Sequence, residues 1–253
     1  SPVKIHYREW GEGIPLLFMH GGWGYEIYPI DEQVEAFRGR FRILAPDRSG
    51  YGRSSRIETL PDRFHSAAAV EMTRFLDSLN IERAILWGHS DGAVIAAIMG
   101  SASPERFPGI VMEAFHYDRN KINSSEFFQS MAEAPDSFGE RVCSVLARDH
   151  GDTYWRKVLD MEGRAWLRII EESGDPSKDF FGGRLSALIP PSIFIHGRRD
   201  PRTERTELNG LHTLLPNVPI QLIEEGGHCP HGESRCAGEF NRIMGEFLGS
   251  IAS

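Results

Sequence analysis

The chain has 253 residues, of which 40% are hydrophobic and 25% are charged, values that exclude a disordered, collagen-like or coiled-coil chain. Its 28 Lys and Arg residues against 36 Asp and Glu residues give a formal net charge of -8, and no basic run is longer than Arg198-Arg199. We therefore expect no nucleic-acid partner and no binding to anionic membranes. No apolar stretch approaches the roughly 18 residues that a membrane span needs.

Ser1 opens a stretch that lacks the apolar core of a signal peptide, and the missing initiator Met suggests a trimmed chain. The three cysteines, Cys143, Cys229 and Cys236, are too few and too scattered for a disulfide framework or a zinc site. These features predict a cytoplasmic protein.

Short apolar runs alternate with segments of helical periodicity, a pattern typical of a mostly parallel α/β sheet. The predicted strands are 15–20, 41–46, 83–88, 109–113, 192–196 and 220–223. The predicted helices are 64–79, one that includes 93–98, one near 203–215 and one near 234–249.

Residues 116–187 interrupt this alternation. The segment carries aromatic residues at roughly helical spacing, broken by Gly and Pro, and is too long to be a loop in a compact domain. We predict a helical lid over 116–187, inserted after the strand that ends near Glu113, and an α/β core formed by 1–115 and 188–253. Such an insertion would cover the carboxyl edge of the sheet, where open α/β sheets bind ligands.

Gly88-His89-Ser90-Asp91-Gly92 matches the pattern G-x-S-x-G. It directly follows an apolar strand and opens a helix of small residues, which is the strand–turn–helix context of a nucleophile elbow. A β-turn with a helix-capping serine is the alternative. His89 would point away from the reacting atoms, and a nucleophilic role for Asp91 would need the serine position to be empty.

A serine nucleophile needs a base, and the base needs an acid that orients it. Asp200 follows the fifth predicted strand, and His228 follows the sixth, in the chain order Ser, Asp, His. We predict Ser90, Asp200 and His228 as the catalytic residues. Glu113 is an alternative acid and His231 an alternative base.

An oxyanion hole requires two backbone N–H donors. One is expected from Asp91, the residue after the nucleophile. The other is expected from the loop Gly21-Gly22-Trp23-Gly24, with Gly22 preferred over Trp23. The glycine-rich stretch 47–54 lacks a phosphate-loop lysine and a dinucleotide fingerprint, so we expect no cofactor and no metal.

Together these motifs resemble the α/β-hydrolase superfamily and, within it, the serine esterases related to valacyclovir hydrolase, or biphenyl-hydrolase-like proteins. The likeness rests on Trp87-Gly88-His89-Ser90-Asp91-Gly92, on the stretch 152–157 and on the stretch 239–244. That family has a second glycine where this chain has Ala93. The resemblance implies that Asp91 holds the α-amino group of amino-acid esters. Asp91, Trp23 and Trp155 are our candidate substrate contacts.

The sequence therefore predicts a serine hydrolase that cleaves small carboxylic esters, with α-amino-acid esters as one substrate class. An acidic side chain beside the nucleophile would attract a cation and repel a carboxylate. The same triad could instead cleave thioesters, lactones, amides or C–C bonds, or serve a slow ligand receptor with a hydrolase fold. An apolar lid surface could pair two chains as a homodimer.

Overall fold

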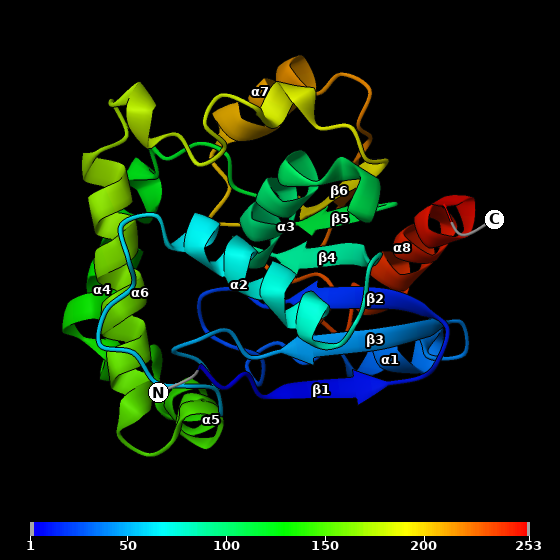
Figure 1. The fold of residues 1–253 in the computed structure, drawn as a ribbon. Coiled ribbons are helices and arrows are strands. Elements are labelled where there is room, and N and C mark those ends of the chain that lie inside the picture. Colours follow the sequence, from blue (N-terminus) through cyan, green and yellow to red (C-terminus); the bar gives the residue numbers. More distant parts are fainter. Residues whose placement is uncertain (1–2, 252–253) are drawn as a thin grey trace.

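Seven strands form one sheet in the order β1-β3-β2-β4-β5-β6-β7 (Figure 1). The computed structural model describes residues 3–251. The strands are β1 (Tyr7–Trp10), β2 (Ile14–Met19), β3 (Phe41–Pro46), β4 (Ile85–His89), β5 (Ile110–Glu113), β6 (Ser192–Gly197) and β7 (Ile220–Ile223). All neighbours pair in parallel except β1, which pairs antiparallel with β3 at the sheet edge. The predicted mostly parallel α/β sheet is confirmed.

Both faces of the sheet are covered by helices, as a parallel sheet requires. The core helices are α1 (Asp31–Phe37), α2 (Phe64–Ser78), α3 (Asp91–Ala102), α7 (Arg205–Leu214) and α8 (Ala237–Ile251). Successive residues of β2 alternate between two cores: Leu17 and Met19 pack with α2 and α3, whereas Leu16 and Phe18 pack with α1 and α8. This alternation explains why the central strands read as continuous apolar runs.

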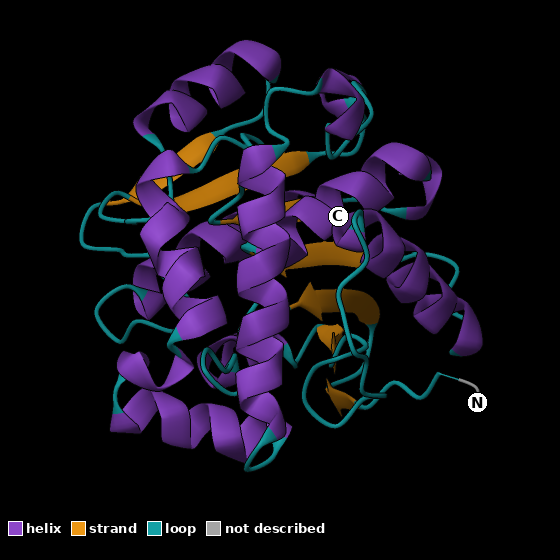
Figure 2. Ribbon diagram, turned by 90° about the vertical axis from the view of Figure 1, so that its left-hand side faces the viewer, coloured by secondary structure: helices purple, strands orange, loops and turns teal. Residues whose placement is uncertain are grey.

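Between β5 and β6 lie α4 (Ser125–Glu133), α5 (Glu140–His150) and α6 (Tyr154–Glu171), with short 3-10 turns around them. We call 116–187 the lid segment. Its helices share a third apolar cluster, which includes Phe128, Leu159 and Trp166. Figure 2 shows the lid helices in front of the sheet, at the end to which the arrowheads of β2, β3 and β4 point in Figure 1. The lid segment therefore stands at the carboxyl edge of the parallel strands.

Two elements were not predicted. The strand β1 is an edge strand whose two central residues, Arg8 and Glu9, are charged, so it lacks the apolar run of the central strands. The helix α1 spans only seven residues and is too short for a clear helical period. In the described range 3–251, no helix combines the length and the apolarity needed to cross a membrane.

Candidate active site

Ser90 lies in the tight turn between β4 and α3. Its backbone has φ 56° and ψ -118°, a conformation that costs energy for a residue with a side chain and is typical of functional turns. A Cβ at Gly88 would overlap the carbonyl of Gly92, and a Cβ at Gly92 would overlap the carbonyl of Met19. The two glycines of the motif are therefore required by close backbone approach, and they hold Ser90 in the strained turn.

Ser90, His228 and Asp200 form a continuous hydrogen-bonded chain. The Nε2 atom of His228 lies 3.1 Å from the Oγ atom of Ser90. The Nδ1 atom of His228 lies 3.0 and 2.9 Å from the two carboxylate oxygens of Asp200. This places the proton of neutral His228 on Nδ1 and leaves Nε2 to accept the serine proton. Burial alone would raise the pKa of Asp200, but His228 and the surrounding donors hold it well below its ordinary value.

The loop after β2 lies against the nucleophile, since a Cβ at Gly21 would be 3.1 Å from Cβ of Ser90. Among the described residues, the backbone N–H groups of Gly22, Trp23 and Asp91 have no hydrogen-bond acceptor. Unpaired amides beside a serine Oγ are what an oxyanion hole requires. The geometry brings the predicted Gly22 and Asp91 together at the site and keeps Trp23 as a neighbouring donor.

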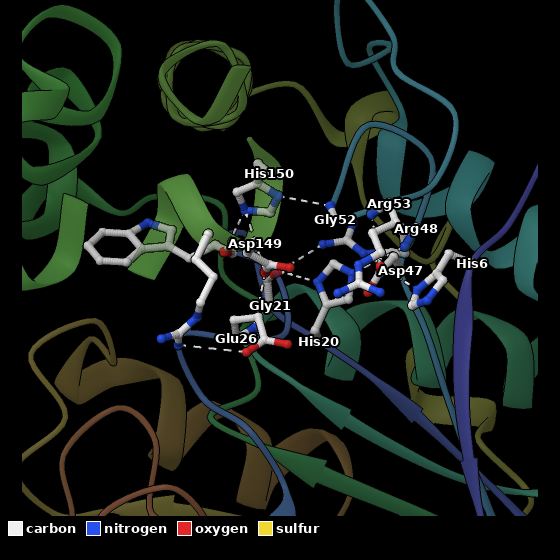
Figure 3. Close-up of polar contacts among 12 residues, drawn as sticks. His6, His20, Gly21, Glu26, Asp47, Arg48, Gly52, Arg53, Asp149 and His150 are labelled. Carbon is white, nitrogen blue, oxygen red and sulfur yellow. Dashed lines mark hydrogen bonds and ion pairs between the residues drawn. The ribbon is translucent and has the colours of Figure 1, made fainter. Parts of the chain in front are cut away.

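Buried side chains hold two carbonyl groups of this loop, those of Gly21 and Trp23 (Figure 3). The carbonyl of Gly21 accepts from the buried Arg48 guanidinium at 3.0 Å and contacts Nδ1 of His20 at 2.7 Å. The Nε2 atom of His20 accepts from the N–H of Arg48 at 3.2 Å, so Nδ1 carries the proton and donates to Gly21. Burial and Arg48 lower the pKa of His20 to about 3.

His150, the last residue of α5, reaches the same loop from the lid segment (Figure 3). Its Nδ1 atom accepts from the N–H of Gly52 at 2.8 Å, so its Nε2–H donates to the carbonyl of Trp23 at 3.1 Å. The neighbouring Asp149 accepts from the N–H of Glu26 at 3.0 Å. The lid segment thus takes part in shaping the oxyanion loop.

A cavity of about 200 Å³ opens beside Ser90, and both the core and the lid segment line it. The predicted residues Ser90, His228, Gly22, Asp91 and Trp23 line this cavity. The rest of the wall is formed by Gly21, Gly24, Tyr28, His89, His116, Lys121, Phe127, Phe128, Met131, Glu162, Trp166, Pro201 and Arg202. A mostly apolar cavity with a few polar groups beside a triad is typical of a small-molecule site.

The expectation that Trp155 contacts the substrate is wrong. Trp155 is 2% exposed, belongs to the apolar core of the lid segment and does not line the cavity. The guanidinium carbon of Arg156 lies 4.2 Å from the centre of its ring. On α6 the residues that line the cavity are Glu162 and Trp166, and Trp166 lies three turns after Trp155 along the same buried face.

The side chain of Asp91 is buried and engaged on both oxygens. Its Oδ1 atom accepts from Nε2 of His65 at 2.7 Å and from Nε1 of Trp166 at 3.1 Å. Its second oxygen faces the carboxyl of Glu162, and both groups lie directly behind Gly22. Burial and Asp91 hold the pKa of Glu162 well above its ordinary value, whereas donors around Asp91 outweigh its burial and lower its pKa. Glu162 is thus protonated and donates to ionised Asp91.

Glu113 and His231, the alternative acid and the alternative base, pair with each other. The Nδ1 atom of His231 lies 2.6 Å from the carboxylate of Glu113, and both residues are fully buried. His89 donates from Nε2 to the carbonyl of His228 at 2.9 Å, which supports the structural role expected for it. These contacts hold the loop that carries His228.

One group of ligand atoms, from His89, Glu113 and Cys229, lies within 4.8 Å in the described part of the chain. The carboxylate of Glu113 is already occupied by His231, and burial raises the pKa of the Cys229 thiol well above its ordinary value. A thiol that keeps its proton is a poor metal ligand, so this donor set fits a hydrogen-bonded cluster.

Five polar residues of the cavity region were not singled out from the sequence: His65, His116, Lys121, Glu162 and Arg202. Of these five residues, only Glu162 could have been recognised from the sequence. It stands in register with the buried apolar stripe of α6, where an acidic side chain is unexpected without a partner.

The residues 16–242 match the model of the alpha/beta hydrolase family, so the chain belongs to that family. A human protein named serine hydrolase BPHL is 23% identical to this chain, over 97% of this chain and 83% of that protein. Epoxide hydrolase A of Mycobacterium tuberculosis is 33% identical, over 97% of this chain and 94% of that protein.

Solved structures share the fold. An epoxide hydrolase from Bacillus megaterium in complex with an inhibitor superimposes with a TM-score of 0.76 at 21% identity, over 98% of this chain and 97% of that one. A thermophilic esterase from Thermogutta terrifontis gives a TM-score of 0.75 at 20% identity, over 99% and 95%. The family match, together with the hydrolases among the curated relatives, supports hydrolysis as the activity class of the chain.

Proposed function

We propose that this chain is a serine hydrolase that cleaves small carboxylic esters through an acyl-enzyme. The observation that carries the proposal is the unbroken chain from Ser90 through His228 to Asp200, next to the unpaired amides of Gly22 and Asp91. A serine at the nucleophile position supports acyl transfer because its hydroxyl can form an ester with the substrate acyl group.

The geometry supports a two-step reaction. His228 takes the proton of Ser90 as Oγ attacks the carbonyl carbon, and the carbonyl oxygen becomes an oxyanion facing the amides of Gly22 and Asp91. When the oxyanion collapses, the bond to the alcohol oxygen breaks, and His228 gives its proton to that oxygen. Water then attacks the acyl-enzyme with His228 as base, which releases the acid and restores Ser90. Asp200 orients His228 and stabilises its charged form.

The test is turnover of a short-chain p-nitrophenyl ester by the wild-type protein and by Ser90→Ala. We expect a burst of p-nitrophenol equal to the enzyme concentration and a loss of kcat/KM on the order of 10³-fold or more in the variant. Ester turnover by a folded Ser90→Ala protein at the wild-type rate would exclude this mechanism. A panel of thioesters, lactones, amides and epoxides separates ester cleavage from the other chemistries.

Selectivity for α-amino-acid esters remains a prediction. It would require Asp91 to bind an ammonium group, although His65, Trp166 and Glu162 already occupy its carboxylate. Phenylalanine benzyl ester and its des-amino analogue differ only in the amine. A strong preference for the amino ester, lost in Asp91→Asn, would support the role, whereas equal rates would leave Asp91 with its backbone amide and its buried contacts.

A further inference from the structure

Arg202 lines the cavity, and no described residue accepts a hydrogen bond from its guanidinium. It lies two residues after Asp200, and its guanidinium carbon is 3.8 Å from the ring centre of Phe127. Its Nη1 atom is buried and has no acceptor, and no carboxylate in the described residues lies within 4 Å of the guanidinium. Arg202 as a whole is only partly buried, but a buried guanidinium N–H that lacks an acceptor is costly. Such a group is expected where a ligand supplies the acceptor.

Asp200 does not fill this role. Its carboxylate oxygens accept from His228, from the backbone N–H of Arg202 at 2.7 Å and from the hydroxyl of Thr203 at 2.9 Å. Burial lowers the pKa of Arg202, and this effect exceeds the opposing attraction of Asp200. The positive charge of Arg202 is therefore only partly compensated at a distance and is not hydrogen-bonded.

The backbone of Arg202 is held in place by Lys121, which is 1% exposed. The ammonium group of Lys121 donates to the carbonyl of Arg202 at 3.1 Å, to Nδ1 of His116 at 2.9 Å and to the carboxylate of Glu207. An ammonium can only donate, so Nδ1 of His116 accepts and its Nε2 carries the proton. Burial and Lys121 lower the pKa of His116, which keeps the ring neutral.

His116 adds a second donor to the wall of the cavity. Its ring lines the cavity and lies nearly parallel to the ring of His228, with centres 5.6 Å apart and an angle of 8° between the planes. No described residue accepts a hydrogen bond from its Nε2–H. The cavity wall next to His228 thus presents two unpaired donors, one of them charged, and both are positioned through Lys121.

The charge pattern of the cavity runs opposite to the expectation from the sequence. The carboxylate of Asp91 is neutralised locally by the donors of His65, Trp166 and protonated Glu162. Arg202 is the cavity charge without a bonded partner among the described residues. A carboxylate matches the planar fork of a guanidinium and can accept from a neighbouring imidazole N–H as well.

We propose that the cavity accepts an ester that carries a carboxylate, and that Arg202 binds this carboxylate with the Nε2–H of His116 as a second donor. The inference rests on the proposed ester hydrolysis and specifies its substrate class. Because the reacting carbonyl must reach Ser90 within the same small cavity, the carboxylate stands only a few bonds from the ester, in its acyl or its alcohol part.

Two pairs of esters of matched shape test the proposal. Monomethyl glutarate is compared with methyl 5-methylhexanoate, and 3-acetoxypropanoate with isoamyl acetate, so that an isopropyl group replaces the carboxylate in each pair. We expect the wild-type protein to favour the charged ester of at least one pair by 10-fold or more in kcat/KM. In Arg202→Met this ratio should fall by about 10- to 100-fold, mainly through KM, and Arg202→Lys should restore part of it.

Arg199→Met is the matched control, because it removes a charge from the same loop at an exposed position paired with Glu225. Arg199→Met should keep the wild-type ratio of kcat/KM between the charged and the uncharged ester of each pair. The proposal is overturned if neither pair shows a preference for the charged ester, or if Arg202→Met keeps that preference.

A binding experiment separates this inference from the proposed function. Calorimetry with monomethyl glutarate is carried out on Ser90→Ala and on Ser90→Ala combined with Arg202→Met. Loss of binding only in the double variant supports the carboxylate site even if no ester is turned over, in which case the proposed function alone fails. Equal binding by both proteins contradicts the role of Arg202.

Discussion

The carboxyl groups of Asp91 and Glu162, which are 71 positions apart in the chain, lie together in the wall of the cavity, directly behind Gly22. The pair joins the start of α3 to the middle of α6 and so links the core to the lid segment. Tyr51 donates its hydroxyl to one oxygen of Glu162, and the other oxygen lies next to the carboxylate of Asp91 behind Gly22. The local charge is therefore a single negative charge held among fixed donors.

Glu162→Gln should stabilise the protein at neutral and alkaline pH. The pKa of Glu162 is raised in the folded state, so the folded protein keeps a proton that the unfolded chain releases above its ordinary pKa near 4.5. Stability is therefore lost as pH rises above that value, and a glutamine removes this loss. We expect a gain of about 1 to 2 kcal/mol at pH 8, measured by urea unfolding. A variant less stable than wild type at pH 8 would show that Glu162 is ionised.

Gly22→Ala should impair catalysis more than binding. A Cβ at this position would lie 2.5 Å from Oε1 of Glu162 and 2.8 Å from Oδ2 of Asp91, so the loop must move and carry its amide away from the oxyanion. We expect kcat to fall roughly 10- to 100-fold, as for other ångström-scale misplacements. Gly39→Ala is the control, since a Cβ there meets no atom within 4 Å. Equal kcat values for the two variants would contradict the assignment.

Acid should unfold the protein through its buried histidines. The pKa values of His20 and His89 are lowered to about 3, and that of His196 to about 4, with burial as the main cause. These rings stay neutral in the folded state, so stability is present above pH 6.5 and is lost as pH falls toward the folded values. These three groups together contribute a slope of about 4 kcal/mol per pH unit between pH 6 and 4.5, and His65 and His116, whose pKa values are also lowered by burial, act in the same direction.

Replacing His196 tests whether the buried histidines cause the acid sensitivity. Both of its ring nitrogens are buried without a partner in the described range, so His196→Phe removes a titrating group and leaves no donor unpaired. The slope of stability against pH, from thermal unfolding between pH 4.5 and 7.5, should fall by about 1.4 kcal/mol per pH unit below pH 6. An unchanged slope would assign the acid sensitivity to other groups.

Trp155 and Trp23 should differ in what their replacement changes. Trp155→Phe leaves a gap in the buried core of the lid segment and should lower the free energy of unfolding by about 1 to 2 kcal/mol, with KM unchanged. Trp23 lines the cavity and packs on Phe127 and Phe138, so Trp23→Phe should change KM several-fold. Steady-state kinetics and urea unfolding of both variants test this contrast.

That Ser90, Asp200 and His228 lie together could be predicted because each of them follows a strand. Ser90, Asp200 and His228 stand just past β4, β6 and β7, and parallel strands bring their carboxyl ends to one edge of the sheet. The position of each residue just after a strand was therefore enough to predict that the three side chains meet at this edge. The same reasoning located the central strands to within two residues.

The partners of Asp91 could not be predicted in this way. His65 and Trp166 come from α2 and α6, whose packing on the core depends on contacts far apart in the chain. The helical period shows which face of α6 is buried, but it does not show what that face meets. For the same reason Trp155 and Trp166 could not be distinguished, since both lie on the buried face of one helix and only one reaches the cavity.

His150 connects the oxyanion loop, Gly21–Gly24, to the packing of α5 on the core. The triad belongs entirely to the sheet and its loops, but the carbonyl of Trp23 is held by an imidazole that α5 delivers. A molecule whose α5 has come away from the core would keep its nucleophile and base in line and still lack a fixed anion-stabilising loop. We therefore expect the catalytic rate to follow the fraction of molecules in which α5 is packed on the core, so that mild denaturant abolishes activity before the sheet unfolds.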